Sequence, residues 1–388
     1  IDYDATIGVA VRDGDDLVNE VDIEWTSLDG TNAGERGGNG DLSTETPGGG
    51  ANDYEEGDNA SIRANLTPEY SFEKSVFTTS ETFTGDNAGT SLTIPDLVIG
   101  ETVTFDLVAT IGRGTTDQVR IVDQLSIANG LLDITNVQVQ AGAALSLGSG
   151  NPFSSLTISE TDNLGTDGYN DRVEINFGTV INDPDLVTDT ASEQIRIRIE
   201  AVLVNDFANQ DGDVIRNTGT LTFLDDVNGD GTRTTRTMTS DADVEIVEPV
   251  VNTTKTITTL PANPTAGERV EYQVVLSNPA AVAGENIIAF DVTARDDLPN
   301  NLSMDVSTFE ARLNGTLVPN TNFTLTTDGW ALVTPSGLDL DQGDNLVITY
   351  EAVIQPGVQD GENLVNEVDV EWTSLDGTVA GERTGNGD

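Results

Sequence analysis

The chain has 388 residues, enough for two or three domains that each bury a core. Its 67 acidic and 17 basic residues give a net charge of -50, which would repel nucleic acid and anionic membrane surfaces. Neither histidine nor cysteine occurs, which excludes disulfides, the common zinc ligands, histidine bases and thiol nucleophiles. Because its hydrophobic residues, 36% of the total, fall in alternating Val, Ile and Phe runs, we expect folded β domains with acidic surfaces.

The first expected strands are IDYDATIGVAV, at 1–11, and LVNEVDIEW, at 17–25, joined by a polar turn. A long loop rich in Gly, Asp, Asn and Thr follows, and the strand SIRANL then runs into Pro68. Proline restricts the chain and cannot donate to a central ladder, so we place a domain boundary near residue 67. Residues 1–67 are therefore predicted to be the C-terminal part of a β-sandwich domain.

The same succession returns before Pro249, where the strands IRNTGTLTFLDD and ADVEIV occur. This predicts a complete β-sandwich domain B at 68–248 and a domain C at 249–388. Apolar side chains recur at period two in both domains, as in strands with one buried face, and no helical period of useful length appears. The predicted fold class is all-β: tandem Greek-key, immunoglobulin-like β-sandwiches in an extended array.

A long repeat relates the two ends of the chain. Residues 1–41 align without a gap to residues 348–388 and are identical at 29 of 41 positions. A period of 347 residues predicts a window on a longer repetitive polymer, because large tandem units build extended arrays. We expect both copies to adopt the same backbone. No apolar run approaches the length of a membrane span.

Domain C resembles the DUF11 repeats of bacterial and archaeal surface proteins, through NTTKTIT, PTAGERVEYQVVLSNP, FDVTARDDLPNNL and LVNEVDVEW. Relatives of these repeats include fimbrial domains that form internal isopeptide bonds. The resemblance extends to residues 1–67, and in domain B it covers landmarks separated by insertions. It implies a non-enzymatic structural protein, outside the cell or at its surface, whose tandem repeats form a stalk, filament or matrix fibre. Its partners would be copies of itself, joined end to end or by strand donation. The alternative is an adhesin that binds a glycan or a protein.

The chain contains two lysines, Lys74 and Lys255, each six residues after its boundary proline and in the first strand of its domain. Such a lysine can lay its stem on the sheet edge with its ammonium in water, or it can turn inward. Burial would lower its pKa and leave a nucleophilic neutral amine. In isopeptide-forming domains, that amine attacks an Asn side chain with help from a carboxyl group. The resemblance implies two such sets: Lys74, Asp123 and Asn217 in domain B, and Lys255, Asp296 and Asn366 in domain C.

The late loop of domain B contains Asp226, Asn228 and Asp230 at alternate positions, followed by Gly231. This is the opening half of a calcium loop, in which alternate oxygen ligands precede a glycine at the sharp turn. Thr237 stands where the usual twelfth-position Glu would be, so an acidic hairpin loop without metal is the alternative. Calcium is the one cofactor that the sequence suggests.

Overall fold

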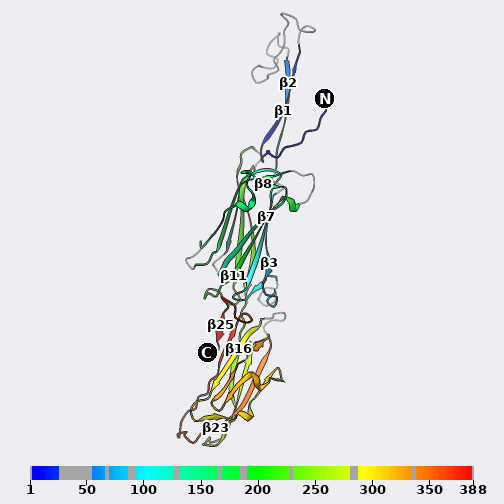
Figure 1. Cartoon of the computed structure of the whole chain (residues 1–388). Coiled ribbons are helices and arrows are strands. Elements are labelled where there is room, and N and C mark those ends of the chain that lie inside the picture. The colour runs from blue at the N-terminus through cyan, green and yellow to red at the C-terminus, as the bar shows by residue number, and fades with distance from the viewer. Residues whose placement is uncertain are drawn as a thin grey trace.

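The fold is all-β, as predicted. The computed structural model describes residues 2–25, 55–65, 70–85, 93–125, 131–163, 168–183, 190–226, 230–279, 287–333 and 338–386. Within these ranges, helical structure is limited to 3-10 turns of three or four residues. An N-terminal two-stranded ribbon, domain B and domain C follow one another along an elongated molecule (Figure 1).

Domain B is a sandwich of two sheets. The first sheet has the order β3-β5-β11-β7, with bounds Ser71–Thr79, Thr102–Thr110, Gln194–Leu203 and Leu132–Ala141. The second sheet has the order β4-β13-β12-β6-β10-β8, and β9 also pairs with β10. Its bounds are Asp96–Leu97, Thr234–Ile246, Val214–Asp225, Gly114–Leu125, Arg172–Asn182, Leu145–Leu147 and, for β9, Ile158–Thr161.

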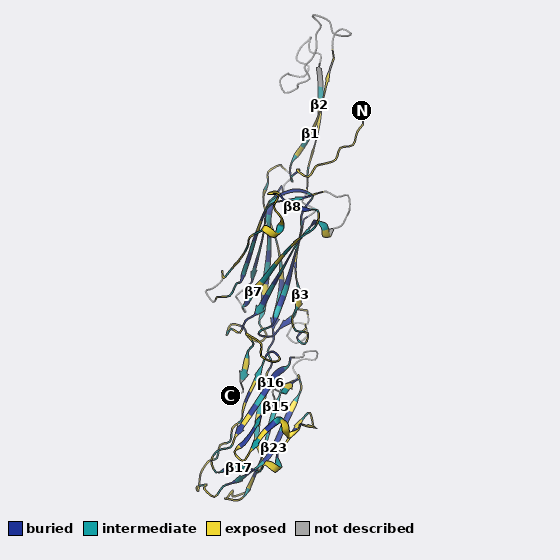
Figure 2. Cartoon of the chain, in the orientation of Figure 1, coloured by how far each residue is buried: buried dark blue, intermediate teal, exposed yellow. Residues whose placement is uncertain are grey.

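The core of domain B lies between these sheets and follows the period-two pattern. In β11, Ile195, Ile197 and Ile199 are buried, whereas the residues between them face outward. Both sheets contribute to one apolar cluster between Tyr70 and Ile246. Figure 2 shows this alternation of buried and half-buried positions along the strands of both sandwiches.

Domain C is a second sandwich with its own core, between Val251 and Val370. One sheet has the order β14-β15-β23-β18-β19, with β17 also paired to β23. Its bounds are Asn252–Thr259, Arg269–Ser277, Asn345–Ile354, Glu310–Leu313, Thr316–Leu317 and, for β17, Leu302–Met304. The other has the order β20-β21-β16-β24-β25, with β22 also paired to β16. Its bounds are Phe323–Thr326, Gly329–Leu332, Ala289–Asp297, Asp369–Thr373, Thr384–Asn386 and, for β22, Leu338–Leu340.

The joint between domains B and C is apolar at its centre. Val98 and Val247 of domain B form a buried cluster with Ile287 and Leu375 of domain C. Beside it, the rings of Phe83 and Phe290 meet edge to face, with centroids 5.2 Å apart. Since apolar area is removed from water on both sides, this contact favours a fixed angle between the domains.

Arg383, in the last turn of domain C, connects domain C to domain B. Its guanidinium donates to the carbonyl oxygens of Asp206, at 2.6 Å, and Asn209, at 2.8 Å, and it forms an ion pair with Glu248. In the same turn, Ser374 Oγ donates to the carbonyl oxygen of Ile99 at 2.8 Å. The planar, multi-donor arginine thus binds two segments of domain B that are distant in sequence, at 206–209 and at Glu248.

Replacing Arg383 by alanine should loosen the joint without unfolding either sandwich. Charge-assisted hydrogen bonds to carbonyl and carboxylate oxygens are lost, a contribution of about 2 kcal/mol to docking. Small-angle scattering should then record a broader distribution of end-to-end distances. Arg312→Ala is the matched control, because Arg312 pairs with Glu310 of its own domain and should leave the scattering curve unchanged. An unaltered curve for Arg383→Ala would show that the apolar cluster alone fixes the joint.

The N-terminal ribbon differs from its copy in domain C. Strand β1, Asp16–Glu24, pairs along its whole length with β2, Glu55–Arg63. In the equivalent stretch of domain C, only the last residues belong to a strand, β24. Tyr3 is 65% exposed, whereas its counterpart Tyr350 is 1% exposed. The expectation of a shared backbone is therefore wrong for the described residues. The physical reason is that residues 2–25 lack the flanking strands that β15 and β16 provide in domain C.

Candidate functional site

Lys74 is turned inward between the two sheets of domain B. In β3, Phe72 and Lys74 are the buried positions and their neighbours face solvent. The Lys74 side chain is 0% exposed and its ammonium forms an ion pair with Asp123, which is 1% exposed and lies on β6 of the opposite sheet. The ion pair therefore links the two sheets through the core.

The surroundings of Lys74 disfavour its charge. The ring centroid of Phe105 lies 5.0 Å from Nζ. Burial lowers the pKa of Lys74 to about 8, and the opposing attraction of Asp123 does not restore the ordinary value. Desolvation penalises the charged form, so a neutral amine becomes accessible near physiological pH. A neutral amine has a free electron pair and is a nucleophile.

Asn217 lies next to this pair on the same face of the second sheet. In the register between β12 and β6, Gly219 is opposite Asp123, and Asn217 is two residues away from Gly219. Asn217 is 0% exposed, and neither atom of its carboxamide has a hydrogen-bond partner. Asp123 Oδ2 also has none. Each such buried polar atom costs about 1–3 kcal/mol, so the arrangement requires a physical explanation.

Gly219 allows the sheets to approach each other at this point. A Cβ at this position would lie 3.0 Å from the ring of Phe72 and 3.1 Å from Leu107, both in the facing sheet. These contacts are tighter than ordinary van der Waals distances. The missing side chain thus lets the strand of Lys74 lie close to the strand of Asn217.

Domain C has the same arrangement of Lys, Asp and Asn, with more hydrogen bonds between them and their neighbours. Lys255 Nζ lies 2.7 Å from Asp296 Oδ2 and donates to the carbonyl oxygen of Glu367 at 2.9 Å. Burial lowers the pKa of Lys255 and raises the pKa of Asp296, and the attraction between the two groups opposes both shifts. Asn366 Oδ1 is buried without a hydrogen-bond partner. The Lys255 side chain is 11% exposed, so this site is less enclosed than that of Lys74.

Tyr350 connects the carboxyl and the amide in domain C. Its hydroxyl donates to Asp296 Oδ2 at 2.6 Å and accepts from Asn366 Nδ2 at 2.7 Å. Burial and the nearby Asp296 carboxyl raise the pKa of Tyr350, which keeps the phenol protonated. Sequence reasoning did not select this residue. The sequence does contain a signal for it, because Asn366 follows Tyr350 by 16 residues and Asn19 follows Tyr3 by the same number. Asn19 also donates a hydrogen bond to the Tyr3 hydroxyl, as Asn366 does to Tyr350.

In the described part of the predicted calcium loop, backbone N–H groups of the loop itself donate to the carboxylate of Asp226. Asp226 accepts from the backbone N–H groups of Asp230, at 3.1 Å, and Gly231, at 2.7 Å. Asn228 lies outside the described residues. Among those described, no group of three or more acidic side chains is placed to hold a metal ion. The calcium hypothesis stays a prediction.

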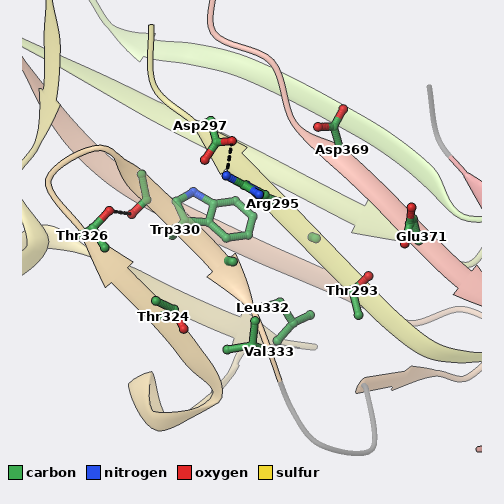
Figure 3. Close-up of a pocket in the computed structure, with 13 residues that line it drawn as sticks. Thr293, Arg295, Asp297, Thr324, Thr326, Trp330, Leu332, Val333, Asp369 and Glu371 are labelled. Atoms are coloured by element: carbon green, nitrogen blue, oxygen red, sulfur yellow. Dashed lines mark hydrogen bonds and ion pairs between the residues drawn. The ribbon is translucent and has the colours of Figure 1, made fainter. Parts of the chain in front are cut away.

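A cleft of about 790 Å³ lies on the outer face of β16, β21 and β24 (Figure 3). Arg295 and Asp297 form an exposed ion pair at its rim, while Asp369 and Glu371 project from β24. Its one aromatic residue, Trp330, is 2% exposed and belongs to the core. The cleft thus lacks the exposed ring on which a sugar could stack.

Fold and sites together define a protein with two tandem immunoglobulin-like β-sandwich domains, each of which has an inward-turned Lys–Asp pair beside an Asn. No helix in the described parts has the length and apolarity to cross a membrane. No protein-family model matches the sequence, and no curated protein matches it. The resemblance to DUF11 repeats stays a prediction.

Solved structures match this chain at low sequence identity and low TM-score. The C-terminal domain of the Streptococcus agalactiae AgI/II polypeptide BspA is 10% identical, with a TM-score of 0.37; the match covers 81% of this chain and 97% of that one. A 35 kDa C-terminal fragment of the S. agalactiae major pilin GBS80 is 13% identical over 82% of this chain and 91% of that one, at 0.30. The S. aureus collagen adhesin CNA is 12% identical over 80% and 91%, at 0.23. At these values we take neither function nor partners from the likeness.

Proposed function

We propose that the protein is a structural, non-enzymatic segment of an extracellular or cell-surface stalk, filament or matrix fibre, and that each sandwich is locked by an internal Lys–Asn isopeptide bond. One observation carries this proposal. In each domain the one lysine is turned inward against a buried Asp, and a nearby Asn carboxamide is left partly or wholly without hydrogen-bond partners. Bond formation would remove the buried charge and use the unpaired amide, which accounts for groups that are otherwise unfavourable in a core.

The chemistry needs only the groups present. A proton passes from the Lys74 ammonium to the Asp123 carboxylate, which leaves a neutral amine and a carboxylic acid. The amine attacks Cγ of Asn217, and the carboxylic acid stabilises the oxygen that becomes negative. The C–Nδ2 bond then breaks, one proton moves from Nζ to the departing nitrogen, and ammonia leaves. Asp123 then passes the proton that it took from Lys74 to the released ammonia, which becomes ammonium, so the carboxylate is restored and no oxidant, metal or cofactor is consumed.

The position of the bonds fits a protein under tension. In domain B the bond would join β3 of one sheet to β12 of the other, and in domain C it would join β14 to the segment that precedes β24. Under tension the backbone hydrogen bonds between two strands can break one after another, whereas strands joined by a covalent bond cannot separate until that bond breaks. Without cysteines, disulfides cannot provide this link.

Peptide mapping tests the proposal directly. Digestion of the unfolded protein followed by tandem mass spectrometry should yield one branched peptide joining Lys74 to Asn217 and another joining Lys255 to Asn366. Linear peptides with free lysine and intact asparagine at all four positions would refute the isopeptide bonds. An adhesin would be indicated if the protein retained a glycan or protein ligand on an array and mutation of the cleft residues Asp369 and Glu371 abolished that retention.

Tyr350→Phe should slow bond formation in domain C by at least tenfold and leave domain B unchanged. The phenol lies between Asp296 and Asn366, where it can pass a proton towards the departing nitrogen, and Phe keeps the ring but removes this path. Domain B is the internal control, because Ile199 occupies the equivalent position. The measurement is the branched-peptide fraction at successive times after refolding. Equal rates in the variant and the parent protein would exclude a role for the hydroxyl.

A further inference from the structure

In domain C, the two oxygens of the Asp296 carboxyl have different surroundings. Oδ2 lies 2.7 Å from Lys255 Nζ and accepts from the Tyr350 hydroxyl at 2.6 Å. Oδ1 is buried and accepts no hydrogen bond. A buried carboxyl oxygen without a donor is unfavourable, so we looked for a donor among the residues that face Asp296.

Trp330 provides a donor beside this carboxyl. It lies on β21, directly opposite Asp296 in the register with β16 (Figure 3). Opposite residues of an antiparallel pair point to the same face, and both of these side chains are buried in the core. The indole N–H of Trp330 has no hydrogen-bond partner either. Burial raises the pKa of Asp296; the attraction of Lys255 opposes this rise, and so does the nearby indole. An unused donor and an unused acceptor thus face each other across two paired strands.

The hairpin of β20 and β21 keeps the indole against Asp296. Gly329, which precedes Trp330, has a φ of +138°, and a Cβ at this position would overlap the carbonyl oxygen of Asp296. Glycine is therefore required for β21 to lie this close to β16. The ring of Trp330 also packs against Phe309 and Phe323, with centroids 6.0 and 6.2 Å away. These rings restrict the indole, so its N–H stays near the carboxyl.

Domain B has an apolar residue at the corresponding position. Val173 of β10 lies opposite Asp123, as Trp330 lies opposite Asp296 in domain C. A valine side chain cannot donate a hydrogen bond, and Asp123 Oδ2 has no partner. The Lys74 side chain is 0% exposed, whereas that of Lys255 is 11% exposed. The less enclosed of the two sites is thus the one with an additional donor beside its carboxyl.

We propose that Trp330 is a positioning residue for the crosslink of domain C: its indole N–H donates to Asp296 Oδ1 and fixes the orientation of the carboxyl. This deepens the proposed isopeptide function and rests on it. The last torsion of an aspartate is broad, so a slight turn brings Oδ1 to the indole N–H. A carboxyl bound there turns no further, and Oδ2 stays beside Lys255 and Tyr350. The proton that leaves the Lys255 ammonium then goes to Oδ2, and the neutral amine stays aligned for attack on Asn366.

Nuclear magnetic resonance of the indole groups tests the contact on the 388-residue protein. The comparison is between Lys255→Met and the double variant Lys255→Met with Asp296→Ala, neither of which can crosslink domain C or bury a lysine charge. Loss of the carboxyl should move the Trp330 indole proton upfield, because its hydrogen bond is lost. The Trp372 indole, which donates to the carbonyl oxygen of Pro249 at 3.1 Å, is the internal reference. A Trp330 resonance at the same position in both variants would overturn the proposal.

Trp330→Phe tests the role in the reaction. After refolding, the branched peptide of domain C should form at least tenfold more slowly, and that of domain B at the parent rate. Because removal of the donor raises the pKa of Asp296, the acid limb of the pH–rate profile should also move to higher pH. Phe323→Leu is the matched control: it disturbs the same aromatic packing but keeps the indole N–H, so the acid limb should not move. An unmoved acid limb in Trp330→Phe would mean that Trp330 only packs.

The two proposals fail in different ways. If the parent protein yields no branched peptide from domain C, the isopeptide proposal is rejected, and the role of Trp330 with it. If the parent crosslinks normally but neither the Trp330 resonance nor the acid limb moves in the variants, only the role of Trp330 is rejected.

Discussion

Replacing Asn217 by alanine should lower the free energy of unfolding of domain B by about 4–5 kcal/mol, and the intact mass should then be below the mass calculated from the variant's sequence by one ammonia fewer than in the parent. The bond between residues 74 and 217 closes a long loop in the unfolded chain, and the entropy model for crosslinks gives this magnitude before strain. The direction of the effect is informative. Without a bond, the substitution only removes a buried amide that has no hydrogen-bond partner, and stability should stay equal or increase. Thermal unfolding and intact mass decide between the two.

The pH dependence of the same variant provides a control. In Asn217→Ala the Lys74 amine is free, with a folded-state pKa of about 8 against 10.5 for an ordinary lysine. A depressed pKa contributes stability that is complete above the unfolded value and is lost as pH falls through the folded value. Domain B of the variant should therefore gain stability between pH 8 and 10.5. The crosslinked parent has no titrating amine at this site, so a parallel gain in the parent would contradict the bond.

Asp123→Ala should be the most damaging single substitution in domain B. It removes the assisting carboxyl, so the bond should not form, and it leaves the Lys74 ammonium buried without a counter-charge. Breaking a buried ion pair on one side costs about 3–5 kcal/mol. The measurements are the unfolding midpoint of domain B and the intact mass.

The matched control is the double variant Lys74→Met with Asp123→Ala. Methionine retains most of the stem that packs near Phe105, and neither charge remains. We expect this double variant to be more stable than Asp123→Ala alone, although it is equally uncrosslinked. If the double variant were less stable, the ion pair would not be a source of unfavourable burial. If Asp123→Ala still lost ammonia, another group would have to assist the reaction.

The inward orientation of the lysines could be predicted from sequence, because local and repeated patterns indicate it. Lys74 and Lys255 share one register after a boundary proline, and period-two alternation in β3 places Lys74 on the buried face. The role of Tyr350 was not predicted, because an aromatic residue at an inward position is typical of any sandwich core. Its hydroxyl becomes meaningful only when β23 is placed opposite Asp296 in three dimensions.

The joint and the ribbon depended on contacts that no local pattern contains. Arg383 reaches Asp206 and Glu248, 177 and 135 residues earlier in the chain. Nothing in the sequence of a polar turn indicates which end of another domain it will meet. The repeat likewise predicted one backbone for both copies. The same residues need neighbouring strands to adopt it, and residues 2–25 do not have them in the described structure.

Both lysines lie inside the protein, and this has a consequence for its surface chemistry. Arginine provides all 15 remaining basic side chains, so no lysine amine is well exposed to the surroundings. Guanidinium groups stay protonated and react poorly with aldehydes, activated esters and reducing sugars at neutral pH. Fixatives and amine-directed dyes should therefore leave the folded sandwiches almost unlabelled. A material made of such units would resist glycation and chemical ageing at its surface, where lysine-rich fibres accumulate damage.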